Sequence, residues 1–320
     1  AVGRINRAVV SGLMLLAMAA ATAHSQTLLS ETTWGGVGSD RAQGVTVAAD
    51  GSAYLVGVSD SFTTDQFGNF KPSIFLVKFT SNGSVAWQRI WNAPAFFIDK
   101  TGVAVSADGS VYVSGHTSLN AGDAVLLKFD AAGSLQWQRH WGGPGNDQNV
   151  SVATDSDGSA YISGRTTSFG PSSAGIFTVK FDPAGTLVWQ KVWDDASGDA
   201  VAVAPDGHVY AAGSKLRPGG LAEFDVVVLK MTATGMLVWQ RAYSAGEVVD
   251  ARGGMTVAAD GSVVVGGAIQ AAKTGTVDIA ALLVKLSADG ALLFDKQIGG
   301  NGGEEGLGVA VGPDGAIHLS

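Results

Sequence analysis

The sequence contains no cysteine, so no disulfide bond can stabilise the fold and no lipid can be attached through a cysteine. Charged residues make up only 15% of the chain and hydrophobic residues 46%, a balance that excludes intrinsic disorder and predicts a large core. After residues 8–23, no hydrophobic run is long enough to span a membrane. We therefore expect no membrane insertion of the mature chain.

The first 25 residues have the pattern of a secretory signal peptide. Arg4 and Arg7 precede the apolar run 8–23, and small residues around Ala23 offer a cleavage site after Ala23 or after Ser25. The alternative is a transmembrane anchor, but the run is shorter than the roughly 20 residues that a spanning helix needs. We therefore expect export to the periplasm, the cell surface or the medium, with residues 26–320 as one folded domain.

The charge balance of the expected mature chain is acidic. Removal of Arg4 and Arg7 leaves 18 basic residues against 28 acidic ones. Nucleic acids and anionic membrane surfaces bind through basic patches, so this balance argues against both as partners.

Two signals alternate along the rest of the chain. The first is Asp-Gly followed by an apolar run and a glycine, as in DGSAYLVG at residues 50–57, and it begins at Asp50, Asp108, Asp157, Asp206, Asp260 and Asp314. The second is a lysine followed by a glycine and then by a tryptophan, as in KFDAAGSLQWQ at residues 128–138. The first signal recurs every 49 to 58 residues, which defines one repeated block.

Each block contains four short apolar stretches rich in valine, tyrosine and tryptophan. In the second block they are residues 101–107, 110–115, 124–129 and 134–141. Turn residues separate them, and no helical period occurs after the signal peptide, so each stretch is predicted to be a β-strand. Asp-Gly and Asn-Gly allow positive φ and predict tight hairpins between strands one and two and between strands three and four.

Four antiparallel strands repeated about every 50 residues predict an all-β β-propeller, because a sandwich would not repeat its sequence and a β-helix has a shorter period. Five complete blades and part of a sixth are expected, as a C-terminally incomplete piece of a six- or seven-bladed ring. Residues 27–34 align with a fourth strand, so that Trp34 matches Trp91, Trp141 and Trp193.

The repeats resemble the bacterial seven-bladed β-propeller repeat family of the SBBP type. The matching elements are Trp-Gly-Gly at 34–36 and 141–143, a following aspartate, the Asp-Gly-x-x-Tyr-x-x-Gly run and the Lys…Gly…Trp close. The resemblance covers roughly residues 27–320. It implies a propeller in an exported bacterial protein and says little about activity.

Large aromatic residues at fixed blade positions are expected to fill the space between neighbouring blades. Strand alternation predicts that Leu135, Trp137, Arg139 and Trp141 share one side of strand four. We therefore assign structural packing, with ligand stacking as the alternative, to the tryptophans Trp34, Trp87, Trp91, Trp137, Trp141, Trp189, Trp193 and Trp239.

A binding site is expected on the end of the blades that carries the loops between strands two and three. These loops vary most between blocks and occupy residues 59–73, 116–123, 165–175, 214–225 and 268–278. One acid per block precedes strand one at this end: Asp40, Asp99, Asp147, Asp199, Asp250 and Glu304. These acids could surround a channel mouth and hold a cation or polar ligand, or each could accept backbone hydrogen bonds in its own loop.

Sequence signatures of enzymes are missing. The five histidines form no pair with metal-ligand spacing, and there is no Gly-x-Ser-x-Gly elbow or Walker-type phosphate loop. Asp155-Ser156-Asp157-Gly158 has a weak likeness to a calcium loop but lacks the remaining ligands, so a plain turn is predicted there. No catalytic residue, metal or cofactor is predicted.

The expected function is therefore a non-enzymatic exported propeller that binds a protein or glycan through its loop end, or a module of a larger surface protein. Two enzyme alternatives stay open. The segment KFDAAGSLQWQ also resembles the last part of the repeat in quinoprotein propellers, whose enzymes hold pyrroloquinoline quinone and calcium. The second alternative, a propeller enzyme that acts on glycans, rests on analogy of fold alone.

Overall fold

The computed structural model describes residues 31–64, 68, 72–91, 101–117, 122–170, 174–217, 224–244, 248–250, 254–273, 276–299, 308–312 and 314–319. These residues form two compact units, one up to Asn149 and one from Val150. The expected signal peptide, residues 1–25, lies outside the described residues. In the part of the chain that is described, no helix is long and apolar enough to cross a membrane.

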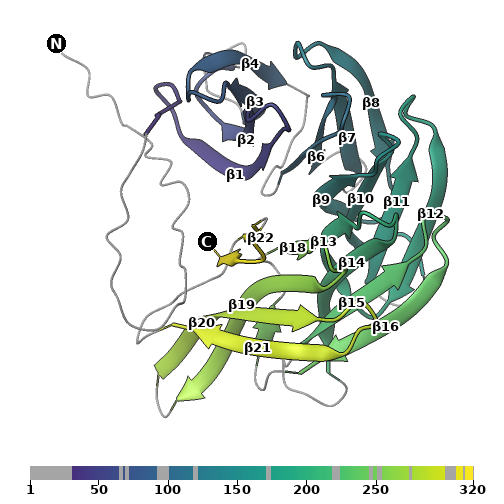
Figure 1. The fold of residues 1–320 in the computed structure, drawn as a ribbon. Helices are drawn as coiled ribbons and strands as arrows, with labels where there is room; N and C mark the ends of the chain where they lie inside the picture. Colours follow the sequence, from purple (N-terminus) through teal and green to yellow (C-terminus); the bar gives the residue numbers. More distant parts are fainter. Residues whose placement is uncertain are drawn as a thin grey trace. The chain divides into compact units, whose positions relative to one another are not determined.

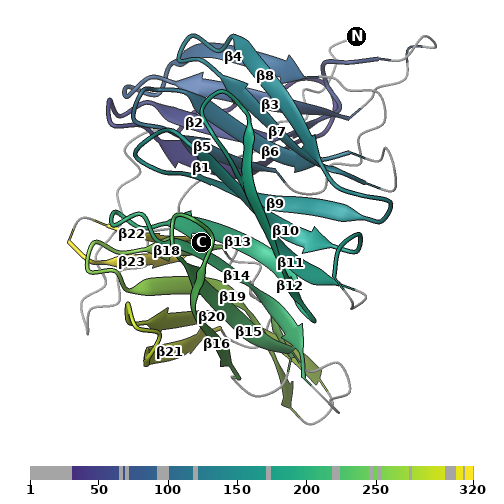
Figure 2. The ribbon, with the colours of Figure 1, turned by 90° about the vertical axis from the view of Figure 1, so that its right-hand side faces the viewer.

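Antiparallel four-stranded sheets are the repeated element of the fold (Figure 1). Blade 1 contains β1 (Asp40–Val47), β2 (Ala53–Ser59), β3 (Ser73–Phe79) and β4 (Val85–Trp91). Blade 2 contains β5 (Gly102–Val105), β6 (Val111–His116), β7 (Ala124–Phe129) and β8 (Leu135–Trp141). Blade 3 contains β9 (Asp147–Thr154), β10 (Ala160–Thr166), β11 (Gly175–Phe181) and β12 (Leu187–Asp194), which lie side by side in Figure 2.

Two further blades and a smaller sheet follow. Blade 4 contains β13 (Ser197–Val203), β14 (Val209–Leu216), β15 (Phe224–Met231) and β16 (Leu237–Tyr243). Blade 5 contains β17 (Val248–Asp250), β18 (Met255–Val257), β19 (Val263–Lys273), β20 (Thr276–Leu286) and β21 (Leu292–Ile298), with β17 and β18 both paired to β19 as two pieces of strand one. The pair β22 (Val309–Val311) and β23 (Ile317–Leu319) forms a partial sixth sheet. The predicted β-propeller with five blades and part of a sixth is confirmed.

In blades 2, 3 and 4 the two middle strands are buried on both faces over most of their length. All six residues of β7, AVLLKF, are buried, which explains why this strand is an unbroken apolar run instead of an alternating one. In the second unit, Val227 and Leu229 of β15 pack towards blade 3, while the neighbouring Val226 and Val228 pack towards blade 5. Each such side chain contributes about 1.5–3 kcal/mol to stability through burial, so the blades are held together mainly by their facing sheets.

The predicted tight hairpins are present. In the first one, Gly51 N–H donates to the carbonyl of Ala48 at 2.9 Å and Ala48 N–H donates to the carbonyl of Ser52 at 2.8 Å. Gly51 has φ +78°, the left-handed conformation that closes a three-residue hairpin loop and that glycine adopts without steric cost. The Asp-Gly pair thus reverses the chain between strands one and two.

A β-bulge near the start of strand four corrects one prediction. Phe129 pairs with Leu135 and Lys128 with Trp137, so Gln136 is an extra residue in β8. Leu135 is 44% exposed and does not share the buried side of Trp137. The bulge shifts the alternation of side chains by one residue, and the same register shift recurs in the other four complete blades.

The fifth expected loop is also different in the structure. Residues 268–273 and 276–278 continue β19 and β20, and the pairing runs to Lys273 opposite Thr276 (Figure 1). This segment contains no proline, whereas three of the other four loops do, at Pro72, Pro171 and Pro218. Without proline, each backbone N–H can join the ladder, which permits the extended hairpin where a loop was predicted.

Candidate functional site

The acids that precede strand one bind groups of their own surroundings. In Asp40, Oδ2 accepts hydrogen bonds from Gly36 N–H and from the Ser61 hydroxyl, both at 2.8 Å. Its Oδ1 accepts from the Ser59 hydroxyl at 2.5 Å. Ser59 and Ser61 lie at the end of β2, so the Asp40 carboxylate joins the start of strand one to the loop between strands two and three.

Asp147 repeats this arrangement. It is fully buried, its Oδ2 accepts from Gly143 N–H at 2.7 Å, and its own N–H donates to the carbonyl of Gly122 at 2.6 Å. A Cβ at Gly142 would lie 2.8 Å from the same carboxylate oxygen, just as a Cβ at Gly35 would lie 2.7 Å from Asp40 Oδ2. The Trp-Gly-Gly…Asp phrase therefore works as a unit, because the first glycine makes room for the carboxylate and the second donates to it.

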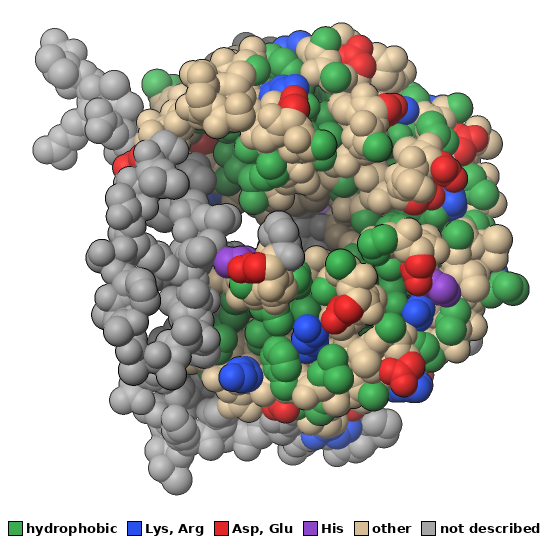
Figure 3. Space-filling view, viewed as in Figure 1, with side chains coloured by type: hydrophobic (Ala, Val, Ile, Leu, Met, Phe, Trp, Pro, Cys, Tyr) green, Lys and Arg blue, Asp and Glu red, His purple; other side chains and the backbone are tan. Residues whose placement is uncertain are grey.

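Of the remaining predicted acids, only Asp199 has a described side chain. Asp199 is 8% exposed and accepts from the Ser214 hydroxyl at 3.3 Å. The backbone of Asp250 belongs to β17, but its side chain is not described, and Asp99 and Glu304 lie outside the described residues. Among the residues with described side chains, which Figure 3 colours by type on one face, no group of three or more histidine or acidic side chains could hold a metal ion. Whether these acids bind a ligand stays a prediction.

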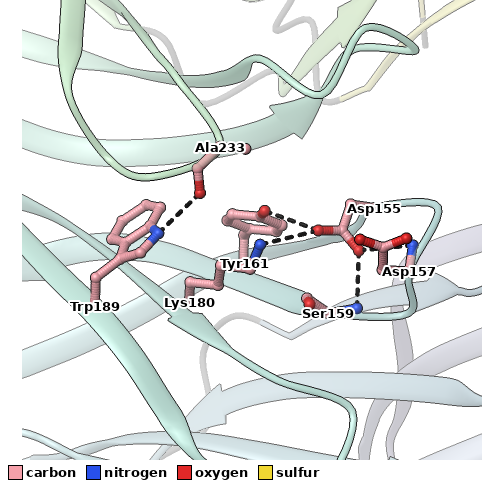
Figure 4. Close-up of polar contacts among 7 residues, drawn as sticks. All are labelled: Asp155, Asp157, Ser159, Tyr161, Lys180, Trp189 and Ala233. Carbon is pink, nitrogen blue, oxygen red and sulfur yellow. Dashed lines mark hydrogen bonds and ion pairs between the residues drawn. The ribbon is translucent and has the colours of Figure 1, made fainter.

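Asp155 is the centre of a partly buried cluster in blade 3 that sequence reasoning missed (Figure 4). Its Oδ1 accepts from the N–H groups of Asp157 at 3.0 Å and Ser159 at 2.9 Å. Its Oδ2 accepts from the Tyr161 hydroxyl at 2.9 Å and from Lys180 Nζ at 3.1 Å. The carboxylate that gave this segment its weak likeness to a calcium loop is thus surrounded by donors from its own blade.

Electrostatics in this cluster favour the charged carboxylate. Burial by itself raises the pKa of Asp155, but the hydrogen bonds from Tyr161, Lys180 and Ser159 outweigh it and hold the pKa below its ordinary value. Burial first, and then the hydrogen bond to Asp155, raise the pKa of the Tyr161 hydroxyl well above its ordinary value. The only sequence signal was an acid at the first position of the turn, where the other complete blades have Ala48, Ser106, Ala204 and Ala258.

The tyrosine, lysine and tryptophan of the repeat form a cross-strand row. In blade 4, Tyr210 pairs with Lys230 and Lys230 pairs with Trp239. Lys230 Nζ lies 5.3 Å from the centre of the Tyr210 ring, and the rings of Tyr210 and Trp239 meet edge-on at 5.9 Å. The same rows occur in blades 1, 2 and 3.

Several tryptophans of this row donate to the following blade. Trp87 Nε1 donates to the carbonyl of Ala131 at 3.2 Å, Trp189 Nε1 to that of Ala233 at 3.0 Å (Figure 4), and Trp239 Nε1 to that of Ala288 at 3.2 Å. The acceptor in each case belongs to the turn between strands three and four of the next blade. At these three junctions the repeated tryptophan therefore provides one hydrogen bond to the next blade.

Residues 27–34 were expected to form a fourth strand, but the described part, residues 31–34, belongs to no strand, although Thr32 makes a contact that such a strand makes. Thr32 Oγ1 donates to the carbonyl of Gly83 at 3.2 Å, as Arg89 Nε donates to the carbonyl of the corresponding Gly133 at 2.6 Å. The Trp34 ring centre lies 4.4 Å from that of Phe75, with the two rings tilted by 42°, and Trp34 Nε1 donates to Gln88 Oε1 at 2.7 Å. The other predicted packing tryptophans lie in or against the core: Trp141 is 7% exposed, and Trp91 and Trp193 pack against buried clusters.

The loop end of the blades is held by hydrogen bonds between separate connections. In blade 4, Arg217 after β14 reaches Asp225 Oδ1 at 2.7 Å and the Ser244 hydroxyl at 3.0 Å, and Ser244 also donates to Asp225. In blade 1, Gly38 N–H donates to the Ser61 hydroxyl at 2.9 Å. These contacts bring the start of the loop between strands two and three next to the connection between blades, so both lie at the same end of the blade, as expected from the sequence.

Comparison with known proteins supports the fold of this chain and assigns it no family. No family model and no curated protein matches the chain. A protein of unknown function from Dyadobacter fermentans is similar in structure with a TM-score of 0.52 and 11% identity, over 88% of this chain and 93% of that one. The propeller of Dos1 has a TM-score of 0.47 and 9% identity, over 88% of this chain and 90% of that one.

A eukaryotic initiation factor is also similar, with a TM-score of 0.42 and 11% identity over 82% of this chain. The chain spans 55% of the length of that protein. At such identities the likeness concerns the fold alone.

Proposed function

We propose that this chain is an exported, non-enzymatic propeller that binds a protein or glycan through the loop end of its blades, alone or as a module of a larger surface protein. The observation that carries the proposal is the Arg217–Asp225–Ser244 cluster, in which hydrogen bonds join the two ends of the β14–β15 connection to the connection that follows β16. Loop ends that are held in place lower the ordering cost of binding.

The contrast between repeated packing residues and variable loops supports the same proposal. The repeated tyrosines, lysines and tryptophans pack the blades, whereas the loops between strands two and three differ from block to block in length and composition. Loops on a rigid scaffold can vary without loss of stability and are common binding surfaces.

A glycan array probed with residues 26–320 tests the binding proposal. We expect a defined set of glycans to bind, and we expect replacement of residues 217–223 by a short Gly-Ser linker to reduce that binding at least tenfold, about 1.4 kcal/mol. His208→Ser is the matched control, because His208 lies in the tight turn at the opposite end of the same blade and should leave binding unchanged. Binding that survives the loop replacement and falls in His208→Ser would contradict the proposed surface.

The enzyme alternatives are tested on the same protein. Incubation with pyrroloquinoline quinone and Ca²⁺ is expected to give no substrate-dependent dye reduction, and incubation with the bound glycans no shortened products. Either activity would replace the non-enzymatic proposal.

Export is tested by expressing the whole chain in a bacterium and sequencing the N-terminus of the product. We expect a new N-terminus at His24 or Gln26, in a compartment outside the cytoplasm. Retention of residues 1–23 on a cytoplasmic product would contradict it. Membership of the SBBP-type family remains part of the proposal.

A further inference from the structure

The turn between β3 and β4 contains an exposed Asn-Gly pair. Asn82 Oδ1 accepts hydrogen bonds from the Thr80 hydroxyl at 2.5 Å and from Ser84 N–H at 3.1 Å. Gly83 follows with φ +84° and has no side chain to hinder its backbone nitrogen. We infer that Asn82 is a site of spontaneous deamidation, a covalent modification that this protein carries out on itself.

The reaction needs only water. The Gly83 backbone nitrogen loses its proton and attacks Asn82 Cγ, a new C–N bond forms, the bond from Cγ to Nδ2 breaks, and Nδ2 leaves as ammonia. Water then adds to one of the two carbonyls of the cyclic imide and opens it. One opening yields aspartate at position 82, and the other yields isoaspartate, with the main chain routed through the former side chain.

The turn contains features that favour the attack and features that oppose it. The two donors to Asn82 Oδ1 draw electron density from Cγ and stabilise the negative charge that develops on the oxygen. Against this, Gly83 N–H donates to the carbonyl of Thr80 at 2.8 Å, and Thr32 Oγ1 holds the Gly83 carbonyl at 3.2 Å. The reaction therefore requires the turn to open, and the contact from Thr32 slows that opening.

The corresponding turn of blade 5 shows that an aspartate fits. Asp289 occupies the position of Asn82, Gly290 has φ +85°, and the Ser287 hydroxyl donates to the Asp289 carboxylate as Thr80 does to Asn82. Aspartate at position 82 should therefore leave the hairpin intact and add one negative charge. Isoaspartate lengthens the main chain by one carbon and should break the hydrogen bonds of the turn. The turns of blades 2, 3 and 4 carry Ala132, Ala184 and Thr234 here and cannot form the imide.

Peptide mapping by mass spectrometry tests the inference on the whole protein stored in neutral buffer. We expect the Asn82 peptide to convert to separable aspartate and isoaspartate forms several-fold faster than peptides carrying Asn146 and Asn149, which are not followed by glycine. Asn301-Gly302, outside the described residues, provides a second Asn-Gly peptide for reference. Thr32→Val should accelerate the conversion about two- to tenfold, the effect of losing one hydrogen bond.

Two results would overturn the inference. Asn82 that survives as long as Asn146 would show that the closed turn prevents the attack. Equal rates in the native protein and Thr32→Val would show that the turn is not held as described. Asn82→Asp provides the homogeneous product, and we expect its unfolding midpoint to match that of the unmodified protein.

Discussion

The indole N–H of Trp189 donates a hydrogen bond of 3.0 Å to the carbonyl oxygen of Ala233 in the next blade. The ring also packs against the buried cluster between blades 3 and 4. One side chain therefore contributes both apolar area and a directed bond to the same junction, which explains a recurrent tryptophan without invoking a ligand.

Substitution of Trp189 separates these two contributions. We expect Trp189→Phe to lower the free energy of unfolding by about 1 kcal/mol, because the ring stays but the hydrogen bond is lost. Trp189→Ala should lower it by about 3 kcal/mol, because the packing is lost as well. Guanidinium chloride unfolding measures both, with the 53%-exposed Val188→Ala on the same strand as a control that should change little. Equal losses in the two Trp189 variants would contradict the division.

Tyr161 and Tyr210 form a natural matched pair. The Tyr161 hydroxyl donates to the charged Asp155 at 2.9 Å, whereas the buried Tyr210 hydroxyl has no hydrogen-bond partner among the residues that the structure describes. We expect Tyr161→Phe to lower the free energy of unfolding by about 2 kcal/mol. Tyr210→Phe should be neutral or slightly stabilising, and a loss as large as that of Tyr161→Phe would reveal an acceptor for Tyr210.

Ala204→Asp should transfer the blade 3 cluster to blade 4. Ala204 occupies the first position of its turn, as Asp155 does in blade 3, and both turns close with the same pair of backbone hydrogen bonds. An aspartate there would accept from the Tyr210 hydroxyl and raise the free energy of unfolding by about 1 kcal/mol. In a double-mutant cycle the gain should disappear when Tyr210→Phe is also present. A gain that persists in the double variant would have another cause.

Two glycines in blade 4 test backbone strain separately from steric contact. Gly207 and Gly235 both have positive φ, +84° and +78°, but a Cβ at Gly207 would meet nothing within 4 Å, whereas one at Gly235 would lie 3.0 Å from the Trp189 ring. Gly207→Ala should therefore cost only the conformational strain, about 1 kcal/mol. Gly235→Ala should cost at least about 1 kcal/mol more. Thermal unfolding orders the two variants, and the reverse order would be incompatible with the described contact.

Stability should fall at both extremes of pH for identifiable reasons. Burial and a hydrogen bond to Asp295 raise the pKa of Tyr243 to about 12. Because the folded state favours the neutral phenol, this contribution is complete below the unfolded tyrosine pKa of about 10 and is lost as the pH rises from there to about 12. Tyr243→Phe should flatten this part of the pH–stability curve. An unchanged alkaline decline in that variant would exclude Tyr243 as its source.

The acid limb has the opposite sign. Asp155 has a lowered pKa in the folded state, so its contribution is present above the unfolded aspartate pKa of about 3.9 and is lost as the pH falls through the lower folded value. Asp155→Asn should reduce the slope of the free energy of unfolding against pH in the acid range. Asp314→Asn, in the turn between β22 and β23, is the control variant at an exposed aspartate.

The strands and tight turns were predictable because their causes are local. The described Asp-Gly pairs and Asn82-Gly83 reverse the chain, and runs such as AVLLKF are strands because they consist of β-forming residues between such turns. The glycines beside Asp40 and Asp147 were recognised as a repeated phrase, although their purpose, to admit a carboxylate, appeared only in three dimensions.

What the residues alone determined, then, was the repeated blade: its strand order, its turns and the positions of its tryptophans. The tertiary structure decided what each repeated residue touches. The bulge that exposes Leu135, the extended pairing that ends at Lys273 and Thr276, and the donors around Asp155 all depend on atoms brought together from separate strands. A sequence pattern encodes the local preference of each segment, whereas register, and the partner that satisfies a buried polar group, are chosen by the packing of whole sheets.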